Sequence, residues 1–199
     1  MKTTSAARRP VGRPAAATRE QVLTAARTAF VEGRRIEVRA IAAEFGASRA
    51  TMYRWFGSRE GLLAEVVLGE MAALFDRADR RARGRGADRV LDTLESVNRR
   101  LIDSPPLRSF LALEPSGLQI LTSSSGRVQP GVVGIAAAYL DRVATEDDFR
   151  PPIELTTLAY AIVRLSEAFV HDDSPAGMRH EIGRLREIHA ALLGVSQKD

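Results

Sequence analysis

Cysteine is absent from the 199 residues, which excludes disulfide bonds, thiolate metal sites and cysteine nucleophiles. The absence also fits a reducing compartment, so we expect a cytoplasmic protein. No apolar run approaches the roughly 18–20 residues that a membrane-spanning helix needs. The first ten residues carry basic side chains with no apolar stretch behind them, so we expect no secretory signal.

The sequence also lacks the signatures of enzyme active sites. Its three histidines are His171, His180 and His189, and no two of them have the H-x-x-x-H or HExxH spacing of a metal site. There is no Walker phosphate-binding loop, no dinucleotide-binding fingerprint and no G-x-S-x-G nucleophile turn. We therefore expect no catalytic activity, no metal and no cofactor.

The charge of the chain is unevenly distributed. Residues 1–60 hold 12 of the 29 Lys and Arg residues and 5 of the 25 Asp and Glu residues, a formal net charge of +7. The other 17 basic and 20 acidic residues give the rest of the chain a net charge of −3. This asymmetry favours an N-terminal module that binds a polyanion such as nucleic acid. The alternative is a basic surface that serves solubility alone.

Apolar residues recur at helical spacing along most of the chain, and no segment has the alternation of a strand. The sequence therefore predicts an all-α fold of about nine helices. Prolines at 105–106, 115, 130 and 151–152, together with Gly126, are expected to separate the later helices. The predicted helices cover residues 18–33, 38–45, 49–56, 58–83, 87–102, 107–113, 117–122, 132–143, 153–171 and 175–193.

Residues 38–56 predict a helix-turn-helix unit. Two short helical segments are joined at Gly46, and Ser48 is placed to cap the second of them. Such a unit places its second helix in the major groove of DNA. Arg49 and Arg54 can donate to guanine edges or phosphates. Ser48, Thr51 and Tyr53 can bond phosphates, whereas Ala47 and Ala50 allow close approach, and Ala42, Ala43, Met52 and Phe56 form the predicted inner packing.

Two questions about this unit stay open at the level of sequence. Trp55 can either contact phosphate or pack inside the unit. The whole segment can also be an ordinary helical hairpin with a solvated, arginine-rich face. Residues 1–17 are expected to form a flexible basic arm in which Arg8, Arg9 and Arg13 reach the minor groove. The alternative for the arm is a tail that adds only nonspecific electrostatic affinity.

Residues 18–63 as a whole resemble the TetR/AcrR family of bacterial regulators. The resemblance rests on the alanine-rich first helix ending near Phe30, on Ile41-Ala42 and Gly46, on Thr51-Met52-Tyr53 with Phe56, and on Ser58-Arg59-Glu60-Gly61-Leu62-Leu63. It implies a DNA-binding domain at 18–63 and a helical ligand-binding and dimerisation domain at 64–199. It further implies a homodimer on a pseudo-palindromic operator. The predicted DNA-binding residues are Arg8, Arg9, Arg13, Arg39, Ser48, Arg49, Ala50, Thr51, Tyr53, Arg54, Trp55 and Arg59.

A narrower resemblance extends into the C-terminal half. Phe110-Leu111, Glu114-Pro115, Leu121-Thr122-Ser123, Val128-Gln129 and residues 158–169 are similar to the QsdR-like subgroup, named for a repressor of a lactone-degradation operon. The apolar and aromatic middle of the body suits a lactone or acyl-chain effector. The predicted ligand-binding residues are Phe110, Leu111, Glu114, Leu118, Leu121, Tyr139, Tyr160, Val163, Arg164 and Glu167.

Other interpretations of the body remain. Arg164 and Glu167 can form a structural ion pair at i, i+3 instead of a ligand anchor. The apolar stripe Ile182, Leu185 and Leu192 predicts that the last two helices form the dimer interface, and the alternative is that the stripe is plain intrachain core. The sequence as a whole predicts a ligand-responsive, dimeric, DNA-binding repressor. The competing classes are an architectural DNA-binding protein with a filled body and an all-α enzyme that uses the polar stripe of residues 153–171.

Overall fold

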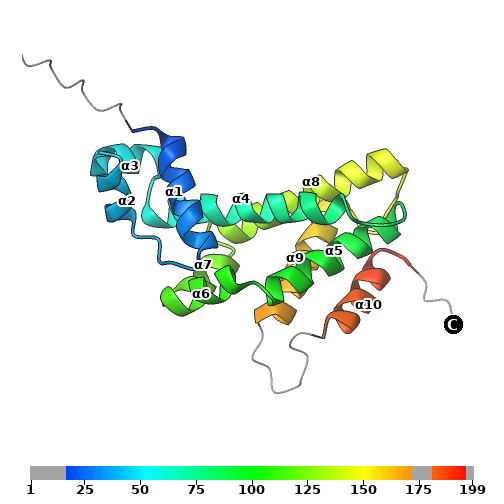
Figure 1. Cartoon of the computed structure of the whole chain (residues 1–199). Coiled ribbons are helices and arrows are strands. Elements are labelled where there is room, and N and C mark those ends of the chain that lie inside the picture. Colours follow the sequence, from blue (N-terminus) through cyan, green and yellow to red (C-terminus); the bar gives the residue numbers. More distant parts are fainter. Residues whose placement is uncertain (1–16, 172–180, 196–199) are drawn as a thin grey trace, which may run out of the picture.

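The computed structural model describes residues 17–171 and 181–195. Within these ranges the chain forms ten α-helices and no β-strand (Figure 1), which confirms the predicted all-α fold, and each of the ten predicted segments overlaps one of these helices. No helix in the described ranges combines the length and apolarity needed to cross a bilayer. The helices are α1 (Arg19–Val31), α2 (Val38–Glu44), α3 (Arg49–Phe56), α4 (Arg59–Asp79), α5 (Ala87–Ile102), α6 (Pro105–Leu113), α7 (Gly117–Thr122), α8 (Val128–Asp147), α9 (Leu155–His171) and α10 (Ile182–Leu192).

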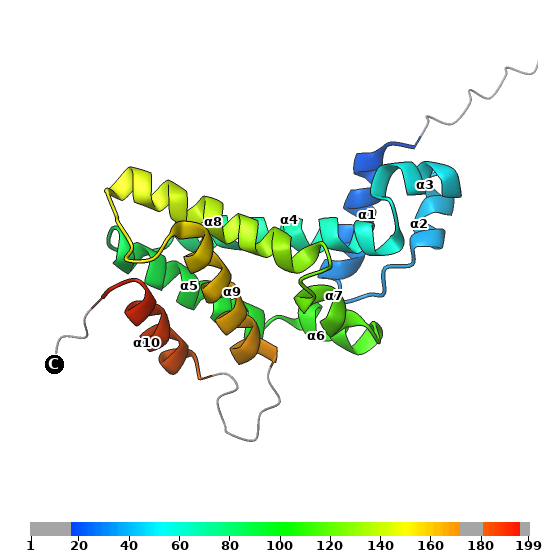
Figure 2. The same ribbon diagram turned by 180° about the vertical axis from the view of Figure 1, so that it is seen from behind.

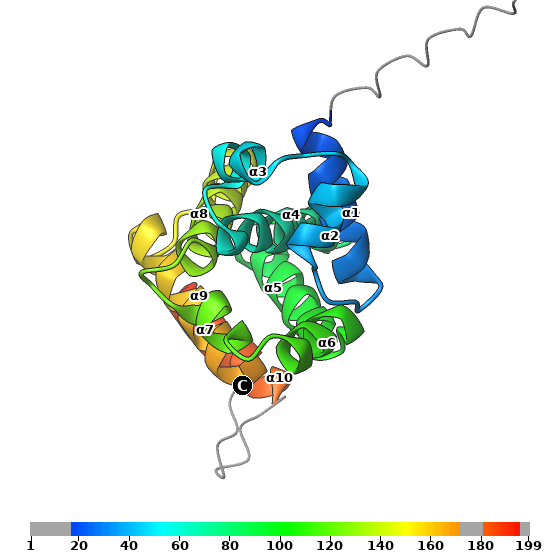
Figure 3. The same cartoon turned by 90° about the vertical axis from the view of Figure 1, so that its left-hand side faces the viewer.

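The helices form a small three-helix unit and a larger body. Helices α1–α3 lie together at one end of the molecule, and α4 runs from this unit along the body (Figures 1 and 2). Viewed from the three-helix end, α8 and α9 lie on one side of the body and α5 and α6 on the other (Figure 3). The long α4 therefore connects the two parts directly.

Two apolar cores hold these parts together. The first core joins α1–α3 and the start of α4, and it is completed by Phe110 of α6, Leu121 of α7 and Val128 of α8. The second core joins the rest of α4 with α5, α8, α9 and α10. Because the body contributes side chains to the first core, a shift of α6 or α7 would change the packing of the three-helix unit.

Short polar side chains start several helices as the sequence predicted. Thr18 and Gln21 form a reciprocal capping box at α1. The hydroxyl of Ser48 accepts from the backbone N–H of Thr51 at 3.1 Å, and Ser58 caps α4 in the same way. Gly46 has a φ of 66°, a conformation that glycine adopts without strain, in the turn between α2 and α3.

The helices separate near both proline sites as predicted, but the prolines lie in the first turn of the following helix and not between the helices. Pro105 and Pro106 are the first two residues of α6, where Ser104 caps the helix by accepting from the N–H of Leu107 at 3.2 Å. Proline is tolerated there because the first N–H groups of a helix have no partner inside it. Pro130 similarly lies in the first turn of α8. By contrast, α4 ends at Asp79, before the predicted Arg83.

The predicted dimer surface on the last helix is also wrong at its central residue. Leu185 is only 1% exposed in the single chain, because α10 packs against α5 and α9 of the same molecule. Arg186 strengthens this packing by pairing with Asp92 and Glu95 of α5 at 3.1 and 2.8 Å. Leu185 is therefore buried within its own chain, and Leu192 packs against the second core of that chain. The predicted start of this helix at residue 175 lies outside the described residues.

Candidate DNA interface and ligand cavity

One face of α3 is fully presented to solvent. Arg49, Ala50, Tyr53 and Arg54 are all exposed, and their spacing of one, three and one residues places them on one side of the helix. The opposite side carries Met52 and Phe56 (both named in the sequence-based packing), which are buried in the first core. Tyr53 is 72% exposed, although burial of its ring would remove a large apolar area from water.

The basic groups of this face are free to bind a partner. Within the described residues, the side chains of Arg39, Arg49 and Arg54 form no ion pair or hydrogen bond. An open groove of about 750 Å³ runs between α2 and α3, and Arg39, Arg49 and Tyr53 are among the residues that line it. Helices α2 and α3 meet across Gly46 at the outer end of the molecule (Figure 1), away from the body. This arrangement suits a helix that inserts into the major groove.

The structure also places the other predicted residues of this region. Ala43 is exposed and takes no part in the inner packing. Trp55 is half-buried and packs against the first core, with its ring edge-on to Phe56 at 6.3 Å, so the packing interpretation of Trp55 is supported. Ser48 and Thr51 bond to each other at 2.9 Å. The predicted arm residues Arg8, Arg9 and Arg13 lie outside the described residues.

Arg59, predicted to contact DNA, forms a buried connection to the body. Its guanidinium lies 2.5 Å from the carboxylate of Glu114, which is 6% exposed at the end of α6. Arg35, in the loop before α2, lies 3.6 Å from the same carboxylate. Glu114 was predicted as a ligand anchor, but it joins the end of α6 to the loop before α2 and to the start of α4.

A second connection lies where α3 passes into α4. The side chain of Arg127, just before α8, donates to the carbonyl of Phe56 at 3.4 Å. Gly61 packs so closely there that a Cβ atom would lie 1.9 Å from the same carbonyl oxygen. Phe110, another predicted ligand residue, fills the first core with its ring 5.9 Å from that of Phe30, and Leu111 packs against this core. The α6–α8 region is thus fastened to the DNA-binding unit.

A small cavity of about 80 Å³ lies inside the body between α4, α5, α7, α8 and α9. Three of the residues predicted to bind ligand, Leu121, Val163 and Glu167, line it. The other predicted residues do not line it. Tyr139 is buried in the second core with its hydroxyl donating to the carbonyl of Arg89 at 3.3 Å, and Leu118, Tyr160 and Arg164 are exposed.

Asn98 and Glu167 are polar side chains in the lining of this mainly apolar cavity. Asn98 is 2% exposed, and its side chain forms no hydrogen bond with any described residue. Glu167 pairs with Arg164 at 2.6 Å, as the sequence allowed. Burial raises the pKa of Glu167, and the charge of Arg164 opposes that rise. The lining thus contains an amide and a carboxyl group among mainly apolar side chains.

The sequence prediction missed Asn98, although a signal for it was present. Asn98 lies four residues after Leu94 and seven after Leu91, on the buried stripe of α5. A polar residue at such a position is unusual unless it has a partner. Thr122 and Ser166 also line the cavity, and the hydroxyl of Thr122 donates to the carbonyl of Leu118 at 2.9 Å.

Known protein families match both the three-helix unit and the body. Residues 22–66 match the family model of bacterial regulatory proteins of the tetR family, and residues 85–194 match that of the tetracyclin repressor-like C-terminal domain. No curated protein sequence matches the chain.

Solved structures share the fold at low sequence identity. The transcriptional repressor QsdR of R. erythropolis is 24% identical with a TM-score of 0.78, covering 91% of this chain and 96% of its own. The repressor AlkX of Dietzia sp. strain DQ12-45-1b is 19% identical with a TM-score of 0.61, covering 89% and 96%. A putative regulator from Rhodococcus sp. RHA1 is 18% identical with a TM-score of 0.53, covering 90% and 96%. The chain therefore belongs to the TetR family of non-enzymatic, DNA-binding transcription regulators.

Proposed function

We propose that this protein is a dimeric, sequence-specific repressor that releases its operator when a largely apolar ligand, a lactone or acyl-chain compound, binds in the body. The observation that carries the proposal is the pairing of an exposed, unpaired basic face on α3 with an apolar cavity that contains an unpartnered amide. The division into a DNA-binding domain at residues 18–63 and a ligand-binding and dimerisation domain at 64–199 forms part of this proposal.

On the DNA side, we assign base contacts to Arg49 and Arg54 and phosphate contacts to Tyr53 and Arg39. Guanidinium groups on the exposed face of a recognition helix suit bidentate contact with guanine edges. The tyrosine hydroxyl suits a phosphate oxygen. Thr51 and Ser48 support the start of the helix, and Ala50 allows its close approach. Arg59 is reassigned from DNA contact to the connection with Glu114.

On the ligand side, we assign the apolar contacts to residues such as Leu121 and Val163 and the polar contacts to Asn98 and Glu167. A mainly apolar lining with a few polar anchors is the common composition of small-molecule sites. Arg164 closes one edge by donating to the carbonyl of Thr122 at 3.2 Å. The lining supports a lactone or acyl chain better than a sugar, which needs more hydrogen-bond partners.

The two sites are coupled through α6 and α7. Leu107 of α6 and Leu121 of α7 line the cavity, while Glu114 between these helices pairs with Arg59 at the start of α4. A ligand that displaces α6 or α7 would therefore shift Glu114 and disturb its ion pair with Arg59, which joins the body to the DNA-binding unit. Such coupling between two sites is worth about 1–3 kcal/mol, roughly a 5- to 150-fold change in operator affinity.

Replacing Asn98 with leucine tests the ligand site. The variant should melt at a higher temperature, because a buried unpaired amide is replaced by an apolar group of similar size. It should bind the operator normally but respond at least about tenfold less to a lactone or acyl ligand. Differential scanning calorimetry and fluorescence anisotropy on operator DNA measure both effects. A variant with lower stability and unchanged ligand response would place Asn98 in the structural core and remove it from the site.

We place the dimer interface on the outer faces of α8 and α9. Gly134 and Ala138 of α8 and Tyr160 and Ala168 of α9 are exposed in the single chain, and α8 and α9 lie together on one side of the body (Figure 3). Small residues permit close helix approach, and a half-exposed tyrosine is typical of interface cores. Two recognition helices are needed to read two half-sites.

Ala138→Glu tests this interface. The buried charge should convert the dimer to monomers and weaken operator binding by at least about tenfold, because one recognition helix is lost. Ala191→Glu, at an exposed alanine of α10, is the matched control and should stay dimeric. Sedimentation velocity measures the assembly. A dimeric Ala138→Glu protein would move the interface away from α8.

A further inference from the structure

A second and larger hollow lies on the surface of the body. This open cleft of about 890 Å³ is bounded by α1, α4, α5 and α6. Its floor is apolar and includes Phe30, Val67, Met71, Leu74, Leu101 and Leu107. The volume falls in the range of small-molecule sites, about 300–1,000 Å³, whereas the inner cavity of about 80 Å³ falls well below it.

The cleft and the inner cavity share a wall. Val67, Met71, Leu101 and Leu107 line both of them. Methionine is the most adaptable of these side chains, because it is unbranched and has three rotatable bonds. Met71 is also only half-buried. Met71 is therefore the side chain of the shared wall that is best suited to move aside.

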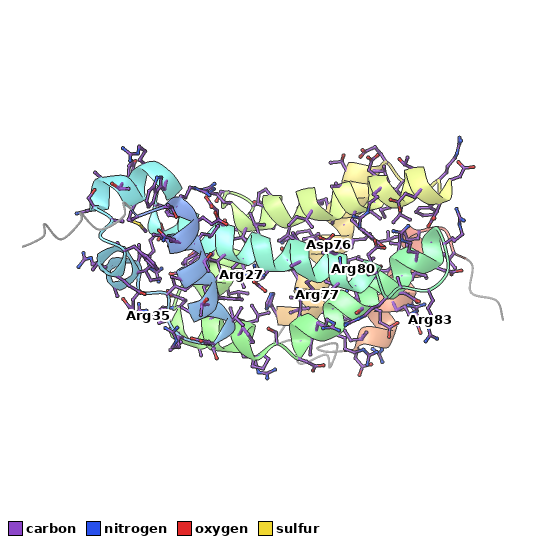
Figure 4. All side chains as sticks on the ribbon, turned by 45° about the horizontal axis from the view of Figure 1, so that its top comes forward. Arg27, Arg35, Asp76, Arg77, Arg80 and Arg83 are labelled. Carbon is purple, nitrogen blue, oxygen red and sulfur yellow. The ribbon has the colours of Figure 1, made fainter. Side chains whose placement is uncertain are left out.

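The rim of the cleft carries an excess of unpaired positive charge. Arg77, Arg81, Arg83 and Arg100 line it, and within the described residues their guanidinium groups form no ion pair. Figure 4 labels two of them, Arg77 on α4 and Arg83 in the loop that follows it.

Most carboxylates of the rim are already neutralised by other arginines. Glu70 pairs with Arg27, and Glu95 pairs with Arg99 at 2.7 Å. Asp92 pairs with Arg186 at 3.1 Å. Among the lining acids this leaves Asp103 against four unpaired guanidinium groups. The cleft thus joins an apolar floor to a strongly cationic rim.

We propose that the cleft binds the phosphorylated head group of an amphipathic ligand whose apolar chain passes Met71 into the inner cavity. This inference rests on the proposed function and names the class of its effector. Arginine forks match phosphate oxygens, and four of them suit a doubly charged phosphate better than a single carboxylate. DNA is a poorer occupant, because a sugar-phosphate backbone has nothing to bury against an apolar floor.

The position of the cleft also gives the head group a route to the DNA-binding unit. Phe30 and Val31, at the end of α1, lie on the cleft wall opposite the start of α6. Val31 is 51% exposed, so an occupant of the cleft would cover it. A ligand that touches α1 and α6 together biases the packing between these helices, on which the orientation of α3 depends.

The test compares three probes of equal chain length on the full-length protein: decyl phosphate, decanoate and decanol. Calorimetric titration should give at least about tenfold tighter binding of decyl phosphate than of decanol at low salt, and the difference should shrink at high salt. The double variant Arg77→Gln/Arg81→Gln should lose roughly tenfold in affinity for decyl phosphate and keep its affinity for decanol. Arg150→Gln, at an arginine outside the cleft whose side chain is 89% exposed, should change neither.

Each of the other outcomes of these titrations would overturn a specific part of the proposal. Equal binding of decyl phosphate and decanol removes the head-group site while the proposed ligand cavity stands. Decanoate binding as tightly as decyl phosphate overturns the phosphate assignment. No binding of any probe refutes the acyl-chain class in the proposed function as well. A loss of ligand-free operator affinity in the double variant would make the cleft a DNA contact and overturn the inference.

Discussion

Arg49→Ala should weaken binding to the operator by about 1–3 kcal/mol and reduce the preference for the operator over a scrambled duplex. Arg49 is exposed in the first turn of α3 and has no partner among the described residues, so its loss leaves the fold intact. Tyr53→Phe should instead weaken binding to both duplexes alike, because a phosphate contact acts on all sequences. Fluorescence anisotropy on the two duplexes separates the effects.

A matched control for this pair is Arg34→Ala. Arg34 is an exposed arginine near the same unit, but it pairs with Glu32 and precedes α2. Its replacement should leave both affinities within the error of the titration. If Arg49→Ala and Tyr53→Phe bind both duplexes as the wild type does, α3 is not the recognition helix.

Leu185→Glu should unfold the C-terminal part of the body, with a loss of about 3–5 kcal/mol in the free energy of unfolding. Leu185 of α10 is 1% exposed where this helix packs against α5 and α9. A glutamate there would place its carboxylate out of contact with water. Urea denaturation followed by circular dichroism measures the loss. The same substitution at Ile188, which is 36% exposed on the same helix, should cost far less and serves as the control.

This second prediction separates two readings of one apolar stripe. A Leu185→Glu protein that is fully folded and monomeric would return the stripe to the dimer interface. The sequence pattern by itself allowed both readings, because helical periodicity gives the apolar face of α10 without saying which surface covers it. Only the tertiary packing shows that α5 and α9 of the same chain already do so.

The DNA-binding unit was the most predictable part because its signals are local. The capping box of Thr18 and Gln21, the turn at Gly46 and the cap at Ser48 each act within a few residues. The prolines at 105 and 106 do mark the separation of α5 from α6, but they lie at the start of α6 and not between the two helices. Proline is equally suited to end one helix and to begin the next, and the capping Ser104 decides between these two outcomes.

The ligand cavity was predicted less well because its residues come from distant segments. Phe110 and Tyr139 have the aromatic character expected of a cavity lining, yet both fill apolar cores. Arg59 and Glu114 are 55 residues apart, and nothing in the local pattern of either reveals their pairing. The Arg164–Glu167 pair was predictable because it spans a single helical turn.

The most direct test of the account is an anisotropy titration of the full-length protein against the DNA that flanks its own gene, with and without decyl phosphate. The account predicts salt-dependent binding that is at least about a thousandfold tighter than binding to a scrambled duplex. It also predicts that the ligand weakens operator binding by roughly 5- to 150-fold. Equal affinity for flanking and scrambled DNA would contradict sequence-specific regulation, and operator binding that no acyl-chain compound or lactone changes would contradict control by a ligand in the body.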